Sequence, residues 1–222
     1  PALRMLSLPR ARLLNASDVG LGKTIETGLC LRELIARRRA ARILILCPAS
    51  IAEQWQEELE TKFGLEFKIF DREGVESSQV ALERDTSPWA VEPRIISSFD
   101  YLKRREGAFR EVQNLRFDVI ICDEAHHLAQ NTIDEDGDIS DRHRLALWAS
   151  QASDSLLLLS ATPHSGYDNS LASLLRLIDP SLVPDPDVLK RSLYERHLIR
   201  HLKRNIFKPD GTPLFVPPEK TK

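Results

Sequence analysis

The sequence predicts an α/β fold in which a mainly parallel β-sheet carries helices on both faces. Short apolar runs alternate along the chain with longer stretches of helical spacing, as in folds built from strand–helix–strand units. The clearest strand is the near-continuous apolar run "ARILILC" at residues 41–47. A strand covered on both faces needs apolar side chains on both sides, so this run indicates a central strand of a parallel sheet.

The expected elements follow one another in a regular order. Ser50 and Glu53 form a capping-box pattern at the start of one helix, and Gly64 is expected to end it. Residues 71–92 are polar and expected to be irregular, and the acidic stretch 131–141 is expected to be a mobile loop. We expect helices at 2–8, 23–39, 50–64, 99–113 and 168–178, and strands at 12–16, 41–47, 67–70, 94–98, 117–126 and 155–163.

Length and composition indicate one domain with a small appendage. Residues 1–180 are expected to form the folded domain, and the proline-rich residues 181–222 a connecting segment. The formal net charge of −2 excludes a chain that is basic overall, so a nucleic-acid surface would be local. We expect no membrane partner, because no apolar run reaches the ~18 residues of a membrane span. The cysteines have no CxxC spacing and are expected to be buried, reduced thiols of an intracellular protein: Cys30, Cys47 and Cys122.

The stretch "SDVGLGKT" at residues 17–24 lies between an expected strand and an expected helix. Gly20 and Gly22 allow main-chain N–H groups to turn toward an anion, and the start of the helix adds its positive end. Lys23 can reach the β- and γ-phosphates of a nucleotide, and the Thr24 hydroxyl can hold Mg²⁺. The alternative is a glycine turn that merely begins a helix, and Ser17 departs from the glycine of the GxxxxGK[ST] pattern. The predicted phosphate site consists of Asp18, Val19, Gly20, Leu21, Gly22, Lys23, Thr24 and Ile25.

A second candidate site follows the apolar run of "VIICDEAHH" at residues 119–127. Asp123 emerges at the end of the expected strand, where a carboxylate can hold Mg²⁺. Glu124 can orient and deprotonate an attacking water. The alternative is an acidic helix start, where Asp and Glu favour the helix dipole. His126 and His127 are adjacent and would point in different directions on a helix, so a zinc site is not expected.

Three further stretches complete an ordered pattern: "LCPASIAEQWQEEL" (46–59), "IISSFDYLKR" (95–104) and "LLLLSATPHSG" (157–166). Together with "DVGLGKTIETG" and "DEAHH" they resemble the motifs of the first RecA-like lobe of superfamily 2 helicases. The sequences of these motifs are most similar to those of the SNF2-type ATPases of the bacterial HepA/RapA branch, and the resemblance covers about residues 12–206. The resemblance implies a RecA-like P-loop domain that binds ATP and Mg²⁺.

The resemblance also implies roles for single residues. Lys23, Thr24 and the main chain of Gly20 and Gly22 would bind ATP and Mg²⁺, Asp123 would hold Mg²⁺, and Glu124 would activate water. Coupling of the nucleotide state to nucleic acid would involve Ser160 and Thr162. Contacts near the nucleic-acid backbone would come from Pro48, Ala49, Ser97 and Ser98. From the residues alone, "SSFDY" is also explained by helix capping, and Trp55 by packing in the core.

The implied activity is ATP hydrolysis coupled to movement on double-stranded DNA, in the bacterial cytoplasm and at the nucleoid. In this family a second RecA-like lobe supplies arginine fingers, and we expect this chain to lack that lobe and to turn over ATP poorly alone. No adenine-recognising glutamine motif precedes the P-loop here. Arg200 and Arg204 are expected to be solvated rather than to act as fingers. Among the basic clusters, residues 103–105 are the first choice for phosphate contacts, against solvated helix ends as the alternative.

The sequence leaves two other functions open. "DEAH" suggests an RNA helicase, against which "GLGKTIE" and "CPAS…QW" argue. The second alternative is a non-catalytic interaction module with a degenerate site. The intact residues Lys23, Asp123 and Glu124 argue against it. Bacterial relatives serve in transcription-complex recycling and in phage defence, and no residue chooses between these roles.

Overall fold

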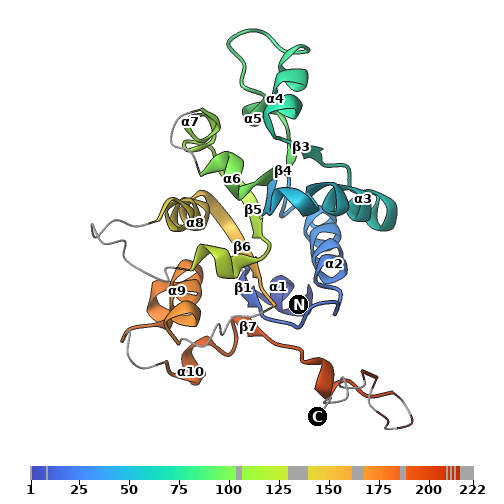
Figure 1. Cartoon of the computed structure of the whole chain (residues 1–222), viewed down its shortest axis with the longest axis vertical. Helices are drawn as coiled ribbons and strands as arrows, with labels where there is room; N and C mark the ends of the chain where they lie inside the picture. Colours follow the sequence, from blue (N-terminus) through green and yellow to red (C-terminus); the bar gives the residue numbers. More distant parts are fainter. Residues whose placement is uncertain are drawn as a thin grey trace, which may run out of the picture.

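The computed structural model describes residues 2–8, 10–103, 107–129, 140–161, 168–185, 189–208, 210, 212 and 214–215. Within them lies one sheet of seven strands in the order β3-β4-β2-β5-β6-β1-β7 (Figure 1). Every strand pair in it is parallel, which confirms the expected fold class. The strands are β1 (Arg12–Asn15), β2 (Ile43–Cys47), β3 (Lys68–Ile69), β4 (Arg94–Ser98), β5 (Phe117–Cys122), β6 (Ser153–Leu159) and β7 (Leu198–Ile199).

The helices lie on both faces of the sheet (Figure 1). The α-helices are α1 (Ala2–Ser7), α2 (Lys23–Ala36), α3 (Ala52–Phe63), α4 (Arg72–Gln79), α5 (Pro88–Val91), α6 (Phe99–Leu102), α7 (Ala108–Val112), α8 (Asp141–Ala152), α9 (Asp168–Ile178) and α10 (Arg191–Tyr194). Short 3-10 turns are η1 (Ala49–Ile51), η2 (Ala125–Leu128), η3 (Pro180–Leu182) and η4 (Lys203–Asn205). No helix in the described part of the chain is both long and apolar enough to cross a membrane.

Strand β2 shows how one apolar run serves two cores. Successive side chains of a strand point to opposite faces. Leu44 and Leu46 belong to the core that α6, α8 and α9 cover, whereas Ile43 and Ile45 belong to the core under α1, α2 and α3. Figure 1 shows these two groups of helices on opposite sides of the sheet. The unbroken run of apolar residues in β2 is therefore explained by burial on both faces.

The expected capping box before α3 is wrong. Residues Ala49–Ile51 form η1, with an N–H bond from Ile51 to the Pro48 carbonyl oxygen at 3.1 Å, and α3 starts only at Ala52. Ser50 therefore lies inside a 3-10 turn, and no side chain caps α3. The expected end is confirmed, because Gly64 has φ 63° and donates its N–H to the Glu60 carbonyl oxygen.

Residues 71–92 were expected to be irregular, and this is wrong. The Asp71 carboxylate accepts the Gly74 N–H at 2.8 Å and so caps α4, while Pro88 at the first turn starts α5. Helix α8 was not anticipated; the Ser140 hydroxyl accepts the His143 N–H at its start. Most of the acidic stretch 131–141 lies outside the described residues.

The segment beyond residue 180 contributes to the sheet. Within it, β7 pairs with β1 in parallel, in the register Leu14 with Leu198 and Asn15 with Ile199. After α9, the chain therefore returns to β1, the strand that leads into "SDVGLGKT". The expected role of residues 181–222 as a connection to a second lobe stays a prediction.

Candidate nucleotide site

The strands β1, β5 and β6 deliver three of the sequence motifs to one edge of the sheet. Because all strands are parallel, their carboxyl ends meet at this edge, where α/β folds bind ligands. The glycine loop follows β1, Asp123 follows β5, and Ser160 follows β6, which lies between the other two. The Ser160 N–H donates to the Asn15 carbonyl oxygen at 2.9 Å and ties the β6 end to the β1 end.

The loop after β1 has the geometry of an anion cradle. Gly20 and Gly22 have φ of 77° and 78°, a left-handed conformation that glycine adopts without steric cost. Helix α2 begins directly at Lys23, and no side-chain hydrogen bond caps it. Its first N–H groups and its dipole are therefore available to an anion. Lys23 Nζ donates to the carbonyl oxygens of Ser17 at 3.0 Å and Asp18 at 3.4 Å, so the ammonium folds back over the loop.

The base of this loop is held by a buried hydrogen-bond network. The Ser17 hydroxyl donates to Asn15 Oδ1 at 2.6 Å, and Asn15 Nδ2 donates to Glu26 Oε2 at 2.8 Å. Ser17 and Asn15 are each 1% exposed. In the sequence, Ser17 is a departure from the glycine of the GxxxxGK[ST] pattern. The structure gives it a supporting role that a glycine, having no side chain, would lack.

Asp123 is nearly buried and both of its carboxylate oxygens have partners. Oδ2 accepts the Trp55 Nε1–H at 2.9 Å, and Oδ1 accepts the Glu124 N–H at 2.8 Å. Burial raises the pKa of Asp123, and these two donors together with the Lys23 charge oppose the rise. Trp55 packs in the core as expected, at 2% exposure. Its hydrogen bond to Asp123 was missed, because no sequence spacing relates two residues so far apart.

Glu124 stands in a left-handed conformation, with φ 48° and ψ 43°, which is uncommon outside glycine. His126 Nδ1 lies 3.2 Å from Glu124 Oε2 and 3.4 Å from Ser160 Oγ. Burial, reinforced by His127, lowers the pKa of His126, so the ring is neutral near pH 7. A chain of polar contacts thus runs from Ser160 through His126 to Glu124.

The residues expected near nucleic acid lie mainly at the ends of β2 and β4. Ala49 is exposed, and Pro48 opens η1. Ser97 is 1% exposed and its hydroxyl donates to the Phe70 carbonyl oxygen at 2.6 Å. The Ser98 hydroxyl accepts the Tyr101 N–H and caps α6, as the capping alternative expects. Nucleic-acid contact stays a prediction for all four, and Thr162 lies outside the described residues.

Residues that could hold Mg²⁺ are few. Within the part of the chain that the structure describes, no three His, Cys, Asp or Glu side chains come together in a metal-binding group. Mg²⁺ in a nucleotide site is usually bound through one or two protein ligands together with substrate phosphates. Asp123 and the Thr24 hydroxyl are candidates for such a site, because they come after β5 and β1, which end at the same edge of the sheet.

The fold is that of solved SNF2 and helicase cores. The SWI2/SNF2 ATPase core of Sulfolobus solfataricus in complex with dsDNA matches with a TM-score of 0.68 at 18% identity, over 91% of this chain and 42% of that chain. The Hef helicase domain of Pyrococcus furiosus matches with a TM-score of 0.59 at 17% identity, over 88% of this chain and 36% of that chain. The architecture is therefore a RecA-like P-loop lobe.

Sequence comparison identifies the family. The SNF2-related domain model matches residues 9–206, and the chain belongs to this family. RNA polymerase-associated protein RapA of Photobacterium profundum is 36% identical over 176 residues, and that of Proteus mirabilis is 35% identical over 174 residues. These matches cover 79% and 78% of this chain but 17% of each RapA protein. The resemblance seen in the motifs is confirmed.

Proposed function

We propose that this chain is the ATP-binding lobe of an SNF2-type motor that hydrolyses ATP and moves on double-stranded DNA. The observation that carries the proposal is the meeting of two elements at one sheet edge. The uncapped start of α2 with Lys23, which follows β1, and the buried Asp123, which follows β5, lie at the same edge of the sheet. A cradle for phosphate beside a carboxylate for Mg²⁺ is the arrangement that ATP hydrolysis requires.

The chemistry divides among few side chains. Gly20, Gly22, Lys23 and the start of α2 would bind the phosphates, and Thr24 and Asp123 would hold Mg²⁺, which neutralises charge on the phosphates. Glu124 would take the proton of the attacking water, since its carboxylate is partly exposed beside Asp123. Ser160 would sense the state of Glu124 through His126.

Duplex DNA is the proposed track. The solved SWI2/SNF2 core that matches over 91% of this chain is bound to dsDNA. Contacts to phosphates, which carry no sequence information, suit a protein that moves along DNA. The association with RNA polymerase that names the RapA proteins is a property of those longer proteins.

The test is ATP hydrolysis by the full-length protein with double-stranded DNA, single-stranded DNA and RNA in parallel. Stimulation by duplex DNA is expected, and Glu124→Gln should lower the rate by roughly 10²–10⁴-fold by removing the general base. Glu60→Gln is the matched control, because Glu60 is exposed in the last turn of α3.

Each other outcome points elsewhere. Stimulation by RNA alone would make the protein an RNA helicase. No hydrolysis with any nucleic acid would leave a non-catalytic module. A Glu124→Gln rate equal to that of the wild type would remove Glu124 from the proposed mechanism.

A further inference from the structure

The pairing between β1 and β7 does not stop where the strands end. Beyond β1, the Ala16 N–H donates to the Ile199 carbonyl oxygen at 2.7 Å, and the Asp18 N–H donates to the His201 carbonyl oxygen at 3.0 Å. The first residues of the glycine loop are thus bound along the segment that follows β7. This segment, residues 200–205, comes 177 or more positions later in the chain than Lys23.

Two side chains of the loop strengthen this attachment. The Ser17 hydroxyl accepts the His201 N–H at 3.2 Å, and Asp18 Oδ2 accepts the Lys203 N–H at 2.8 Å. Side-chain oxygens that bind main-chain N–H groups determine where those main-chain atoms lie. Ser17 and Asp18 therefore fix the point at which the Lys203 side chain starts.

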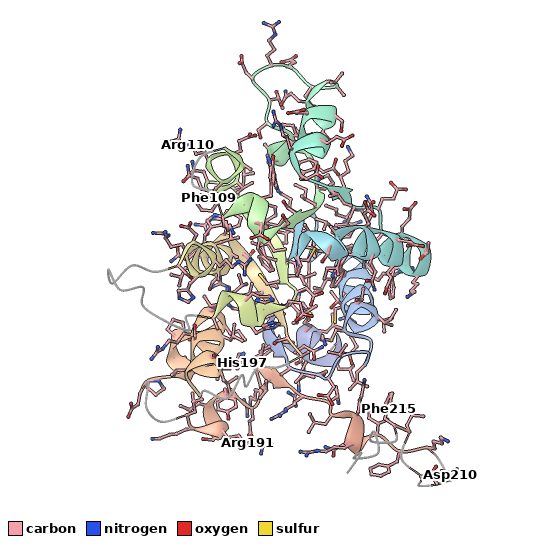
Figure 2. The ribbon with its side chains drawn as sticks, in the orientation of Figure 1. Phe109, Arg110, Arg191, His197, Asp210 and Phe215 are labelled. Carbon is pink, nitrogen blue, oxygen red and sulfur yellow. The ribbon has the colours of Figure 1, made fainter. Side chains whose placement is uncertain are left out.

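That starting point brings the Lys203 ammonium over the loop. Its Nζ lies 3.7 Å from the place where a Cβ on Gly20 would stand. Lys203 is half-buried, whereas its neighbour Arg204 is exposed. Nζ also lies 5.4 Å from the centroid of the Phe215 ring, and Figure 2 shows Phe215 beside η4. Such a cation–π contact is weak at an exposed position, at about 0.5–1 kcal/mol, and an anion can replace it.

We propose that Lys203 is a second phosphate-binding lysine of the nucleotide site. It would reach a phosphate oxygen beside Gly20, in addition to Lys23 at the start of α2. Asp18 and Ser17 are its positioning residues. The inference rests on the proposed nucleotide site, and it adds a group from outside the P-loop motif to that site.

The test compares neighbouring residues of equal charge in the 222-residue chain. Binding of ADP, ATP and adenosine with Mg²⁺ is measured by titration calorimetry for wild type, Lys203→Ala and Arg204→Ala. Lys203→Ala should weaken ADP and ATP binding by about 5- to 10-fold, as expected for one partly solvated charge-assisted hydrogen bond. Adenosine binding should not change, because it has no phosphate. Arg204→Ala should bind all three ligands like the wild type, and Lys203→Arg should retain most of the affinity.

A second measurement does not depend on a substitution. Lysines are acetylated with a water-soluble reagent with and without Mg²⁺–ADP, and the modified positions are read by mass spectrometry. Nucleotide should protect Lys203 and leave the exposed Lys208, five positions later in the chain, unprotected. Equal labelling of Lys203 in both states would overturn the proposal.

The outcomes separate this inference from the proposed function. If Lys23→Ala abolishes ADP binding while Lys203→Ala binds ADP as well as Arg204→Ala does, the nucleotide site is supported and the proposed role of Lys203 is wrong. If the wild-type chain binds neither ADP nor ATP, both fall. Asp18→Ala, which removes the acceptor of the Lys203 N–H, should weaken ADP binding in the same direction as Lys203→Ala, and no effect of Asp18→Ala would contradict the positioning role of Asp18.

Discussion

Polar groups at the carboxyl edge of the sheet differ between the ends of β1 and β5 and the ends of β2 and β4. At the ends of β1 and β5, helix α2 starts without a side-chain cap, two glycines are left-handed, and Glu124 is held in the same unusual conformation. At the end of β4, Ser97 binds a main-chain carbonyl oxygen and Ser98 caps α6. The end of β2 carries Cys47, which is fully buried.

We call the ends of β1 and β5 the open half, because main-chain N–H groups there are available to a ligand. We call the ends of β2 and β4 the closed half, because the serine hydroxyls there bind main-chain atoms of the protein. The main-chain N–H groups at the uncapped start of α2 can bind an anion at little cost, because they have no internal hydrogen bond to break. The Ser97 hydroxyl already donates its proton to the Phe70 carbonyl oxygen and has no donor left for a phosphate, whereas the Ser98 hydroxyl only accepts a bond and keeps its proton. DNA contacts near β2 and β4 would therefore use exposed main chain around Ala49 and surface cations rather than the Ser97 hydroxyl.

The largest effect is expected from Lys23→Ala in the open half. Loss of its charge-assisted bonds should weaken ADP and ATP binding by at least about 100-fold. Calorimetric titration with Mg²⁺–ADP measures this change. Lys62→Ala is the control, since Lys62 forms a surface ion pair with Glu58 on α3. Wild-type affinity in Lys23→Ala would show that the open half is not the phosphate site.

Gly22→Ala should have the next largest effect. A Cβ at φ 78° costs roughly 1–2 kcal/mol, so the loop leaves its anion-binding geometry and ADP affinity falls by about tenfold. Urea unfolding measures the loss of stability, and titration measures the loss of affinity. Gly64→Ala, at φ 63° at the end of α3, should lose stability without losing affinity. Equal affinities for Gly22→Ala and the wild type would contradict the cradle.

Ser97→Ala tests the closed half. The buried Phe70 carbonyl oxygen would lose its donor, and unfolding free energy should fall by about 1–2 kcal/mol. Urea denaturation measures it, with the exposed Ser77→Ala as the control. DNA affinity, measured by fluorescence anisotropy, should stay unchanged. A loss of DNA affinity at unchanged stability would show that the closed half contacts DNA through this hydroxyl.

Ser98→Ala is expected to cost about 1 kcal/mol of stability through the lost cap of α6. The same denaturation series measures it. Ser98→Asp retains a capping oxygen and should recover the stability, while its negative charge would repel a phosphate backbone. Strong loss of DNA binding in Ser98→Asp, with stability intact, would place DNA next to α6. The closed half would then also contact a ligand.

The smallest effect near neutral pH concerns Cys47 at the end of β2. Burial, reinforced by Asp123, raises the pKa of its thiol from 9.0 to about 12. The unfolded thiol loses its proton first, so its contribution to stability is complete below pH 9 and is lost as the pH rises from 9 toward 12. At pH 9 the loss should stay below about 1 kcal/mol. Urea midpoints at pH 7, 8 and 9 measure it, and Cys47→Ala should reduce this dependence without abolishing it, because burial also raises the pKa of the Cys30 and Cys122 thiols.

Much of this molecule follows from local sequence. The apolar run of β2, the stop at Gly64 and the helix at 168–178 were predicted because each depends on neighbouring residues alone. Helix α4 was missed, since its cap at Asp71 comes before a polar stretch with no apolar periodicity to signal a helix. The capping box at Ser50 failed because Pro48 and a 3-10 turn shift the helix start.

The sequence alone determined the alternation of strands and helices, the glycine loop with Lys23, and the acidic pair after β5, because motifs of this kind are contiguous along the chain. Three contacts depend on tertiary structure: Trp55 donates to Asp123, His126 stands between Glu124 and Ser160, and residues 199–203 bind the loop after β1. These contacts join residues up to 185 positions apart. Such pairs are set by the order of parallel strands in the sheet, and no spacing along the chain encodes that order.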